Sequence, residues 1–129
     1  MPDSDYGLSI THRPDLPAVL ARWQREISAD ELRHGYLAIL AAADACGCER
    51  WLLDLRRRNE LIGPEVSKWM TEDFFPRLAG RFGQPVRVAF LLSPLRAHRE
   101  PPLDRPSQPP THEFATFIDE APAYAWLAR

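Results

Sequence analysis

Residues 28–55 read SADELRHGYLAILAAADACGCERWLLDL, in which signals for a long helix are followed directly by an apolar run. Ser28 is a good N-cap, and Glu31 three residues later completes a capping box. Apolar residues then recur at helical spacing up to Gly47, a residue typical of the left-handed position after a helix end. The run 51–55 is short and apolar, which indicates a buried strand. The stretch therefore predicts a helix that leads directly into a central strand.

The flanking segments continue this pattern of strands and helices. Residues 8–10 favour a short strand and residues 16–23 a second one, and the turn chemistry of residues 13–15 predicts that they form a hairpin. Gly63-Pro64 opens a second helix, because a proline at the first helical position loses no hydrogen bond. Pro76 is expected to bend or divide that helix.

The carboxyl-terminal half predicts two more strands. Residues 86–92 form one, and the other is expected to have Phe114, Thr116 and Ile118 on one face. Residues 94–110 are rich in proline and charge, which favours a mobile loop; the alternative is a polyproline II segment at 101–110 that docks a partner. The order β-β-α-β-α-β-β-α predicts an α/β fold, a mixed sheet of about five strands with helices packed on it, in one domain over residues 1–129.

The composition is that of an ordinary globular protein. The chain has 129 residues, 45% of them hydrophobic and 26% charged, which argues against overall disorder. A net charge of -2 provides no general attraction to nucleic acid, so we expect no nucleic-acid partner. The apolar runs are too short to span a bilayer, and the acidic first five residues are the reverse of a signal peptide. We therefore predict no membrane insertion and a cytoplasmic location.

Two polar features lie in or just after the predicted central strand. Arg56, Arg57 and Arg58 follow it, where ligands of open α/β sheets tend to bind, so they are candidates for contact with an anion or a partner. The alternative is a solvated loop whose charges pair with nearby carboxylates. Asp54 is either a functional acid with a perturbed pKa or, as we favour, a strand-end residue that orders the next loop by accepting backbone N–H groups.

Cys46 and Cys48 are separated by one residue, which is too close for comfortable disulfide geometry, so we expect no disulfide. The pair could bind a soft metal or act as a redox pair. A structural zinc needs about four ligands, and the 4 histidines show no metal spacing. We interpret the cysteines as small residues at a junction between helix and strand, and predict no metal and no cofactor.

The aromatic side chains carry the remaining site hypothesis. Tryptophans on four separate predicted elements favour a core role. Trp69, Phe74 and Phe75 are candidates for a pocket or a partner surface instead, because the corner formed by Phe74, Phe75 and Pro76 is the most plausible exposed apolar feature.

Four groups of residues lie in a characteristic order: 51–56, Trp69 with Phe75-Pro76, 86–90, and 117–121 with 126–127. Together they span nearly the whole chain. In their order and spacing they resemble the SpoIIAA-like branch of the STAS domains, the anti-sigma-factor-antagonist fold. The resemblance implies a STAS-like domain that works through protein contacts.

Two features depart from that family. Anti-sigma-factor antagonists carry an Asp-Ser pair at the start of the helix after the central strand, and a partner kinase phosphorylates the Ser. Residues 54–64 here contain no Ser or Thr, and Ser67 does not match that position. The phosphoswitch is therefore not carried over. The second departure is the Pro-rich segment, which lies where such domains often have a helix.

These observations favour a non-catalytic regulatory or protein-interaction module of STAS type, expected to be a homodimer, with a further protein partner not identified. No Gly-x-Ser-x-Gly elbow and no Gly-rich phosphate loop occur, so we expect no enzyme; Asp54 as a base is the catalytic hypothesis that remains. The alternative function is a small-molecule or lipid-binding domain. Its apolar pocket would lie between sheet and helices, with Trp69 in one wall. The arginines at 56–58 would bind the anionic head group of the ligand.

Overall fold

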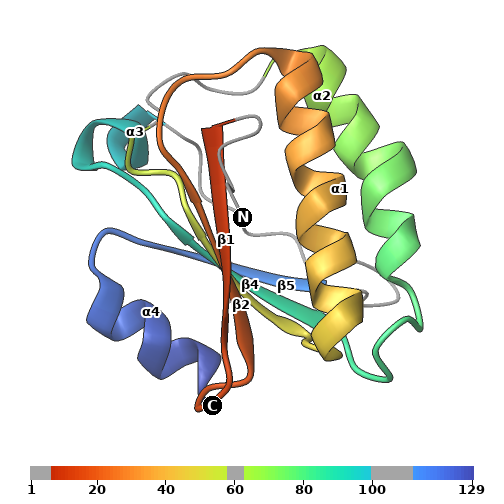
Figure 1. Ribbon diagram of the computed structural model, residues 1–129. Helices are drawn as coiled ribbons and strands as arrows, with labels where there is room; N and C mark the ends of the chain where they lie inside the picture. The colour runs from red at the N-terminus through yellow and green to blue at the C-terminus, as the bar shows by residue number, and fades with distance from the viewer. Residues whose placement is uncertain (1–6, 58–62, 100–111) are drawn as a thin grey trace.

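The computed structural model describes residues 7–57, 63–99 and 112–129. In it a five-stranded sheet has its strands in chain order, namely β1 (Leu8–Arg13), β2 (Ala18–Trp23), β3 (Arg50–Asp54), β4 (Val86–Leu91) and β5 (His112–Phe117). β1 and β2 are antiparallel, and the other neighbouring pairs are parallel (Figure 1). The predicted hairpin, the α/β class and the mixed sheet are therefore confirmed.

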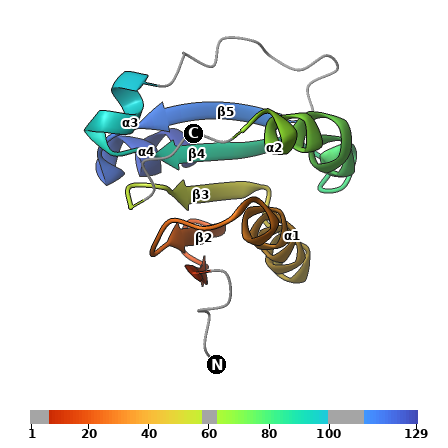
Figure 2. The same cartoon turned by 90° about the horizontal axis from the view of Figure 1, so that it is seen from above.

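Helices cover both faces of the sheet. The long helix α1 (Ala29–Cys46) and the shorter α2 (Pro64–Trp69) lie on one face, and α4 (Glu120–Leu127) lies on the other (Figure 2). A further short helix, α3 (Pro94–Arg99), follows β4. Within the described ranges, none of these helices has the length and apolar character needed to cross a membrane.

The central strand β3 divides the interior into two apolar clusters. Trp51 and Leu53 point into the larger cluster with α1 and α2, whereas Leu52 points into the smaller one with Ala123 and Leu127 of α4. Successive side chains of a strand point to opposite faces, so a strand covered on both faces needs a continuous apolar run. This explains the run that the sequence shows at 51–53.

The ends of α1 form as the sequence predicts. Ser28 Oγ accepts the N–H of Glu31, and the Glu31 carboxylate accepts the N–H of Ser28, which completes the capping box. At the other end Gly47 has a φ of 72°, and its N–H donates to the Ala43 carbonyl at 2.8 Å. Both caps satisfy backbone groups that a helix end leaves unpaired.

The second helix changes its winding along its length. α2 passes into a π-helical turn, η2 (Met70–Phe74), and then into a 3₁₀ turn, η3 (Phe75–Leu78). Pro76 donates no N–H, so the predicted division near this residue is confirmed. The buried side chains of this segment are Val66, Met70, Phe74 and Leu78, four residues apart. On an ideal α-helix, side chains four residues apart differ in direction around the helix axis by about 40°. The wider π turn offsets this rotation, so the four side chains stay on one stripe.

The predicted loop at 94–110 is wrong over its first six residues, which form α3. Ser93 Oγ accepts the N–H of Arg96 at 3.1 Å, as an N-cap does, and Pro94 takes the first helical position. This local start signal outweighs the overall proline content. Residues 100–110 of the predicted loop lie outside the described residues.

The last strand ends earlier than predicted. β5 stops at Phe117, so Ile118 lies outside it with 47% of its surface exposed. Thr116 is exposed as well, and Phe114 of the predicted face packs against the larger cluster. Asp119 then precedes α4, and the chain turns there onto the opposite face of the sheet.

The prediction that Cys46 and Cys48 form no disulfide is also wrong, because the structure joins them. The left-handed conformation of Gly47 turns the chain back between them and brings their Cα atoms to 5.4 Å. That separation is ordinary for a disulfide. The short separation of the two cysteines in sequence does not by itself show that the chain turns back between them.

Candidate functional site

The candidate site lies at the carboxyl ends of the parallel strands β2 and β3. Arg22 is paired in register with Asp54, the last residue of β3. Arg56 follows two residues later, and Glu120 begins α4 on the same side of the sheet. Parallel neighbours end at a common edge, so side chains far apart in sequence come together there. We call this edge, with these four residues, the carboxyl edge.

Asp54 is the centre of the carboxyl edge. Its side chain is only 6% exposed, and its Oδ2 accepts from Arg22 Nε at 2.8 Å and from Arg56 Nη2 at 2.8 Å. Its Oδ1 accepts from the backbone N–H and the Nε of Arg56, each at 3.0 Å. A buried carboxylate is tolerated when charged donors satisfy it in this way.

These contacts set the protonation state of Asp54. Burial by itself raises the pKa of the carboxyl group, but the hydrogen bonds from Arg56 and the charges of Arg56 and Arg22 together hold that pKa below its ordinary value. The same contacts, with Asp54 as the main partner, raise the pKa of Arg56. Asp54 is therefore an ionised acceptor that holds the loop after β3, and such a carboxylate is a weaker base than a free one.

The outer side of the carboxyl edge is half-exposed. Glu120 lies 3.7 Å from Arg22 through Oε1 and 3.7 Å from Arg56 through Oε2. Two arginines and two carboxylates sum to no net charge, and the side-chain exposure of Arg22, Arg56 and Glu120 is 46%, 36% and 42%. A ligand or partner that approaches here meets ordered hydrogen-bonding groups of both signs.

The arginine run does not act as one unit. Arg56 donates to Asp54, as the alternative of a paired loop supposed, whereas Arg57 Nη1 donates to Gln24 Oε1 at 3.0 Å. Arg58 lies outside the described residues. Sequence reasoning missed Arg22 and Glu120, because neither is near Asp54 in the chain. A polar residue near the carboxyl end of β2 is the one signal that pointed to Arg22.

The aromatic candidates divide between core and surface. Phe74 is only 1% exposed, so it belongs to the core and is not a partner surface, but its ring lines the small hollow described below, as the pocket hypothesis supposed. Trp69 is half-buried and stacks on Phe74 with ring centroids 5.6 Å apart. Phe75 is half-buried and packs on Phe114 at 5.1 Å. The side chain at 74 is buried because the π turn directs it toward the sheet.

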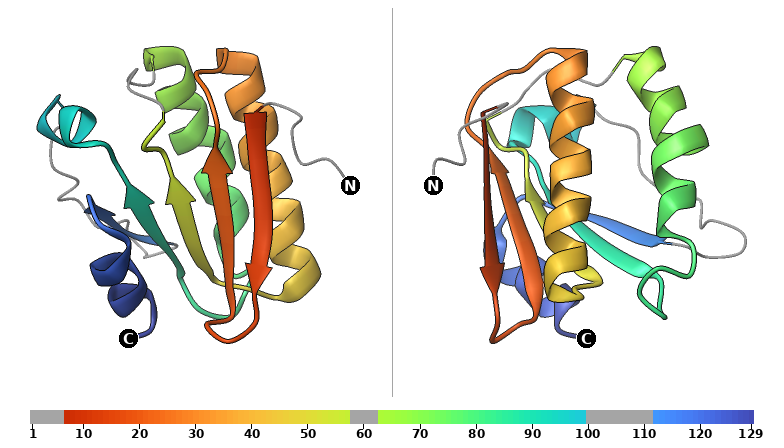
Figure 3. Two further views of the ribbon diagram at one scale, coloured as in Figure 1. Left: turned by 60° about the vertical axis from the view of Figure 1, so that its left-hand side comes forward. Right: turned by 45° about the vertical axis from the view of Figure 1, so that its right-hand side comes forward.

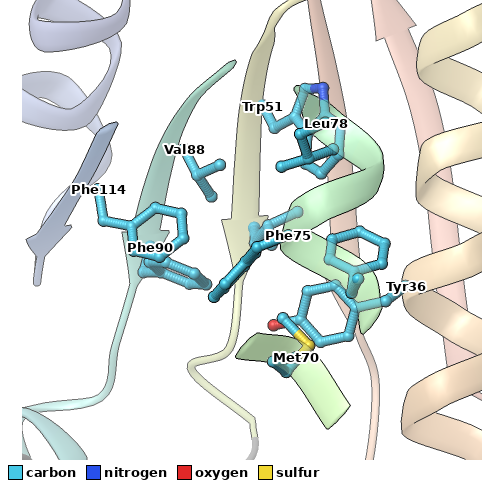
Figure 4. Close-up of a pocket in the computed structure, with 10 residues that line it drawn as sticks. Tyr36, Trp51, Met70, Phe75, Leu78, Val88, Phe90 and Phe114 are labelled. Atoms are coloured by element: carbon cyan, nitrogen blue, oxygen red, sulfur yellow. The ribbon is translucent and has the colours of Figure 1, made fainter. Parts of the chain in front are cut away.

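A small apolar hollow of about 10 Å³ lies beside these rings (Figure 4). This is about the space of one water molecule. Its lining comes from α1, the turns η2 and η3 and strands β3 to β5, and includes Tyr36, Trp51, Met70, Phe75 and Phe114. The hollow is on the face that Trp51 and Leu53 line, whereas Arg56, which donates to Asp54, lies 3.7 Å from Glu120 of α4 on the other side. The structure thus does not bring the aromatic candidates and Arg56 into one pocket.

Two large exposed apolar side chains lie just beyond the carboxyl ends of β4 and β5. Leu95 of α3 follows β4 and is 54% exposed, and Ile118 follows β5 and is 47% exposed. β4 and β5 are neighbours, and the Leu92 N–H donates to the Phe117 carbonyl at 2.8 Å, so the two exits lie side by side. Sequence reasoning assigned Leu95 to a loop and Ile118 to a strand face, and so did not place them together.

Comparison of the chain with family models, with curated proteins and with solved structures found no match.

Proposed function

We propose that the chain is a non-catalytic regulatory or protein-interaction module of STAS type that works as a homodimer. Support comes from the order of the elements, a hairpin followed by helices that alternate with parallel strands. The helix α3 adds to this support, because it lies where such domains often have one. The cytoplasmic location stays a prediction from composition.

The observation that carries the proposal is the surface at the carboxyl ends of the strands. Arg22 and Arg56 are held in place by Asp54 yet remain half-exposed, and Leu95 and Ile118 are exposed after the adjacent strands β4 and β5. Protein interfaces combine apolar side chains with arginines in this way. The groups that contact a partner would thus be arranged before it binds, which reduces the entropy cost of binding.

The first experiment measures the mass of the full chain by light scattering over a range of concentrations. We expect a dimer, and we expect the double variant Leu95→Asp with Ile118→Asp to need at least tenfold more protein to dimerise, about 1.4 kcal/mol of binding free energy. Ala41→Asp is the matched control, since Ala41 is exposed on α1, on the face of the sheet opposite α4. A monomer at every concentration contradicts the homodimer. A double variant that dimerises like wild type places the interface elsewhere.

Native mass spectrometry separates the proposal from its rival. A dimer whose mass equals that of two chains supports the interaction module. An additional small molecule that is lost on denaturation would favour the small-molecule or lipid-binding function instead, and the hollow beside Phe75 and Phe114 would have to widen to hold it.

A further inference from the structure

Three side chains with reactive or metal-binding atoms meet at the opposite end of the sheet from the carboxyl edge. They are His12 of β1, Cys46 at the end of α1 and Cys48 just before β3. One imidazole nitrogen and the two sulfurs all lie within 4.8 Å of one another. Figure 3 shows the end of α1 beside the β1–β2 hairpin. The function proposed above uses none of these residues.

The backbone holds the two sulfurs in unequal environments. Cys48 is 1% exposed, its N–H donates to the Ala43 carbonyl at 3.0 Å, and its carbonyl accepts from Trp51 Nε1 at 3.0 Å. Cys46 is only partly buried, at the end of the helix. The Cys46 sulfur is therefore the one that a molecule from solvent can reach, whereas the Cys48 sulfur is protected within the core.

His12 is placed by the register of the hairpin. It is paired with Val19 and lies on the same face of β1 as Leu8 and Ile10, the face that packs against α1. The ring itself is exposed to solvent. An imidazolium this close to a sulfur stabilises the thiolate form of a cysteine.

We propose that Cys46 and Cys48 form a thiol–disulfide exchange site for low-molecular-weight thiols, with His12 as its proton-transfer residue. A substrate thiolate attacks Cys46 Sγ, the S–S bond breaks, and its electron pair leaves on Cys48 Sγ, which takes a proton from the His12 imidazolium. A second substrate thiolate attacks the substrate sulfur of the mixed disulfide and releases Cys46 as a thiolate, which is protonated from solvent. Two thiols are thereby oxidised to one disulfide, and the protein pair is reduced to a dithiol.

The experiment equilibrates the full chain in glutathione buffers of varied redox ratio, traps free thiols with N-ethylmaleimide and measures the intact mass. We expect each molecule to carry either no maleimide or two, with the proportion following the square of the thiol concentration over the disulfide concentration. Two maleimides at every ratio, or none at every ratio, would overturn the proposal.

Single cysteine variants test the assigned order of attack. Cys48→Ser leaves the accessible Cys46 without its resolving partner, so it should accumulate a mixed disulfide with glutathione. Cys46→Ser leaves only the buried Cys48, which should stay unmodified in the folded protein. The reverse pattern, or equal modification of both variants, contradicts the roles given to the two sulfurs.

A histidine variant tests the role of His12. His12→Ala should slow the approach to the exchange equilibrium by about 100-fold, the lower end of general acid catalysis, because the leaving Cys48 sulfur loses its proton donor. His34→Ala is the control, since that exposed residue lies on α1 about 18 Å along the helix from Cys46. Equal exchange rates for His12→Ala and wild type would remove His12 from the site.

Discussion

At the scale of single residues, Asp54 joins stability to the shape of the carboxyl edge. Its carboxylate is buried at the end of an apolar strand. Hydrogen bonds from the guanidinium groups of Arg22 and Arg56 offset the free-energy cost of that burial. The backbone N–H of Arg56 adds a contact that shapes the loop after β3. The sequence analysis favoured Asp54 as a strand-end residue that accepts a backbone N–H, and this interpretation matches the geometry.

We expect Asp54→Asn to lower the free energy of unfolding by about 1.5–3 kcal/mol at neutral pH, the worth of hydrogen bonds between charged groups. An amide keeps the shape of the side chain but presents one oxygen fewer and no charge. Urea unfolding followed by circular dichroism measures the change. Asp15→Asn is the control, because Asp15 pairs with Arg13 in an exposed turn and should leave the midpoint nearly unchanged. Equal effects of the two variants would contradict this view of Asp54.

The same pair of proteins gives a prediction about pH. The pKa of Asp54 is lower in the folded chain than its ordinary value of 3.8, so the folded state favours the ionised form. The stability from this residue is therefore fully present above about pH 5 and is lost as the pH falls through 3.8 toward the folded pKa. We expect the stability difference between wild type and Asp54→Asn to be constant from pH 5 to 7 and to shrink below pH 4. A difference that grows in acid would reverse the sign of the shift.

Glu31 also titrates in that range, and the comparison with the variant removes its effect. Arg25 and the Ser28 N–H lower the pKa of Glu31 to about 2. Both proteins keep this capping box, so its loss in acid is common to them and cancels in the difference. What remains of the pH dependence belongs to Asp54 and its arginines.

At the scale of elements, α1 depends on one close approach as well as on its caps. A Cβ on Gly35 would lie 3.3 Å from Leu8 Cδ2 and 3.3 Å from Trp23 Cζ2. Gly35 thus lets the helix pack closely over β1 and β2. Helix propensity alone favours alanine at this position by about 1 kcal/mol, so packing and propensity oppose each other there.

We expect packing to win: an overpacking cost of about 2 kcal/mol exceeds the gain in helix propensity of about 1 kcal/mol, so Gly35→Ala should lower the free energy of unfolding by about 1 kcal/mol. Trp23 is fully buried and cannot move aside without disturbing its neighbours. Thermal and urea unfolding of the purified variant measure this change. Ala41→Gly, at an exposed position of the same helix, is the propensity control and should cost about 1 kcal/mol. A more stable Gly35→Ala would show that the helix has room to shift.

At the scale of the whole molecule, Phe74 joins elements that are distant in sequence. Its ring lies 5.3 Å from Tyr36 of α1, 6.2 Å from Trp51 of β3 and 5.6 Å from Trp69 of α2, measured between centroids. Phe75, the next residue, has one face toward the hollow and packs on the edge strand β5. Neighbours in sequence therefore have different roles in the fold.

We expect Phe74→Ala to cost about 3–5 kcal/mol, as removal of a fully buried aromatic ring does. Phe75→Ala should cost less than half as much, because its ring is partly exposed and the hollow beside it is already open. Urea unfolding of both variants gives the comparison. If the two costs were equal, Phe75 would be part of the core and the hollow would not be a weak point of the packing.

The elements that could be predicted from the amino-acid sequence are those whose signals are local. The capping box at Ser28 and Glu31, the left-handed Gly47 and the division of the helix near Pro76 each depend on residues within a turn or two, so the local sequence specifies them. The Ser93-Pro94 signal was equally local, and the proline content of the following residues obscured it.

The contacts between side chains far apart in the chain could not be predicted in this way, because they form when the strands pair and the helices pack. Arg22 reaches Asp54 because β2 and β3 end at one edge, and Glu120 lies near both arginines because α4 crosses to that face. His12 reaches Cys46 because the hairpin register turns it toward α1. Phe74 is buried and Ile118 exposed because of a π turn and an early strand end. These outcomes depend on strand pairing and helix packing between segments far apart in the chain, and periodicity within one segment does not encode them.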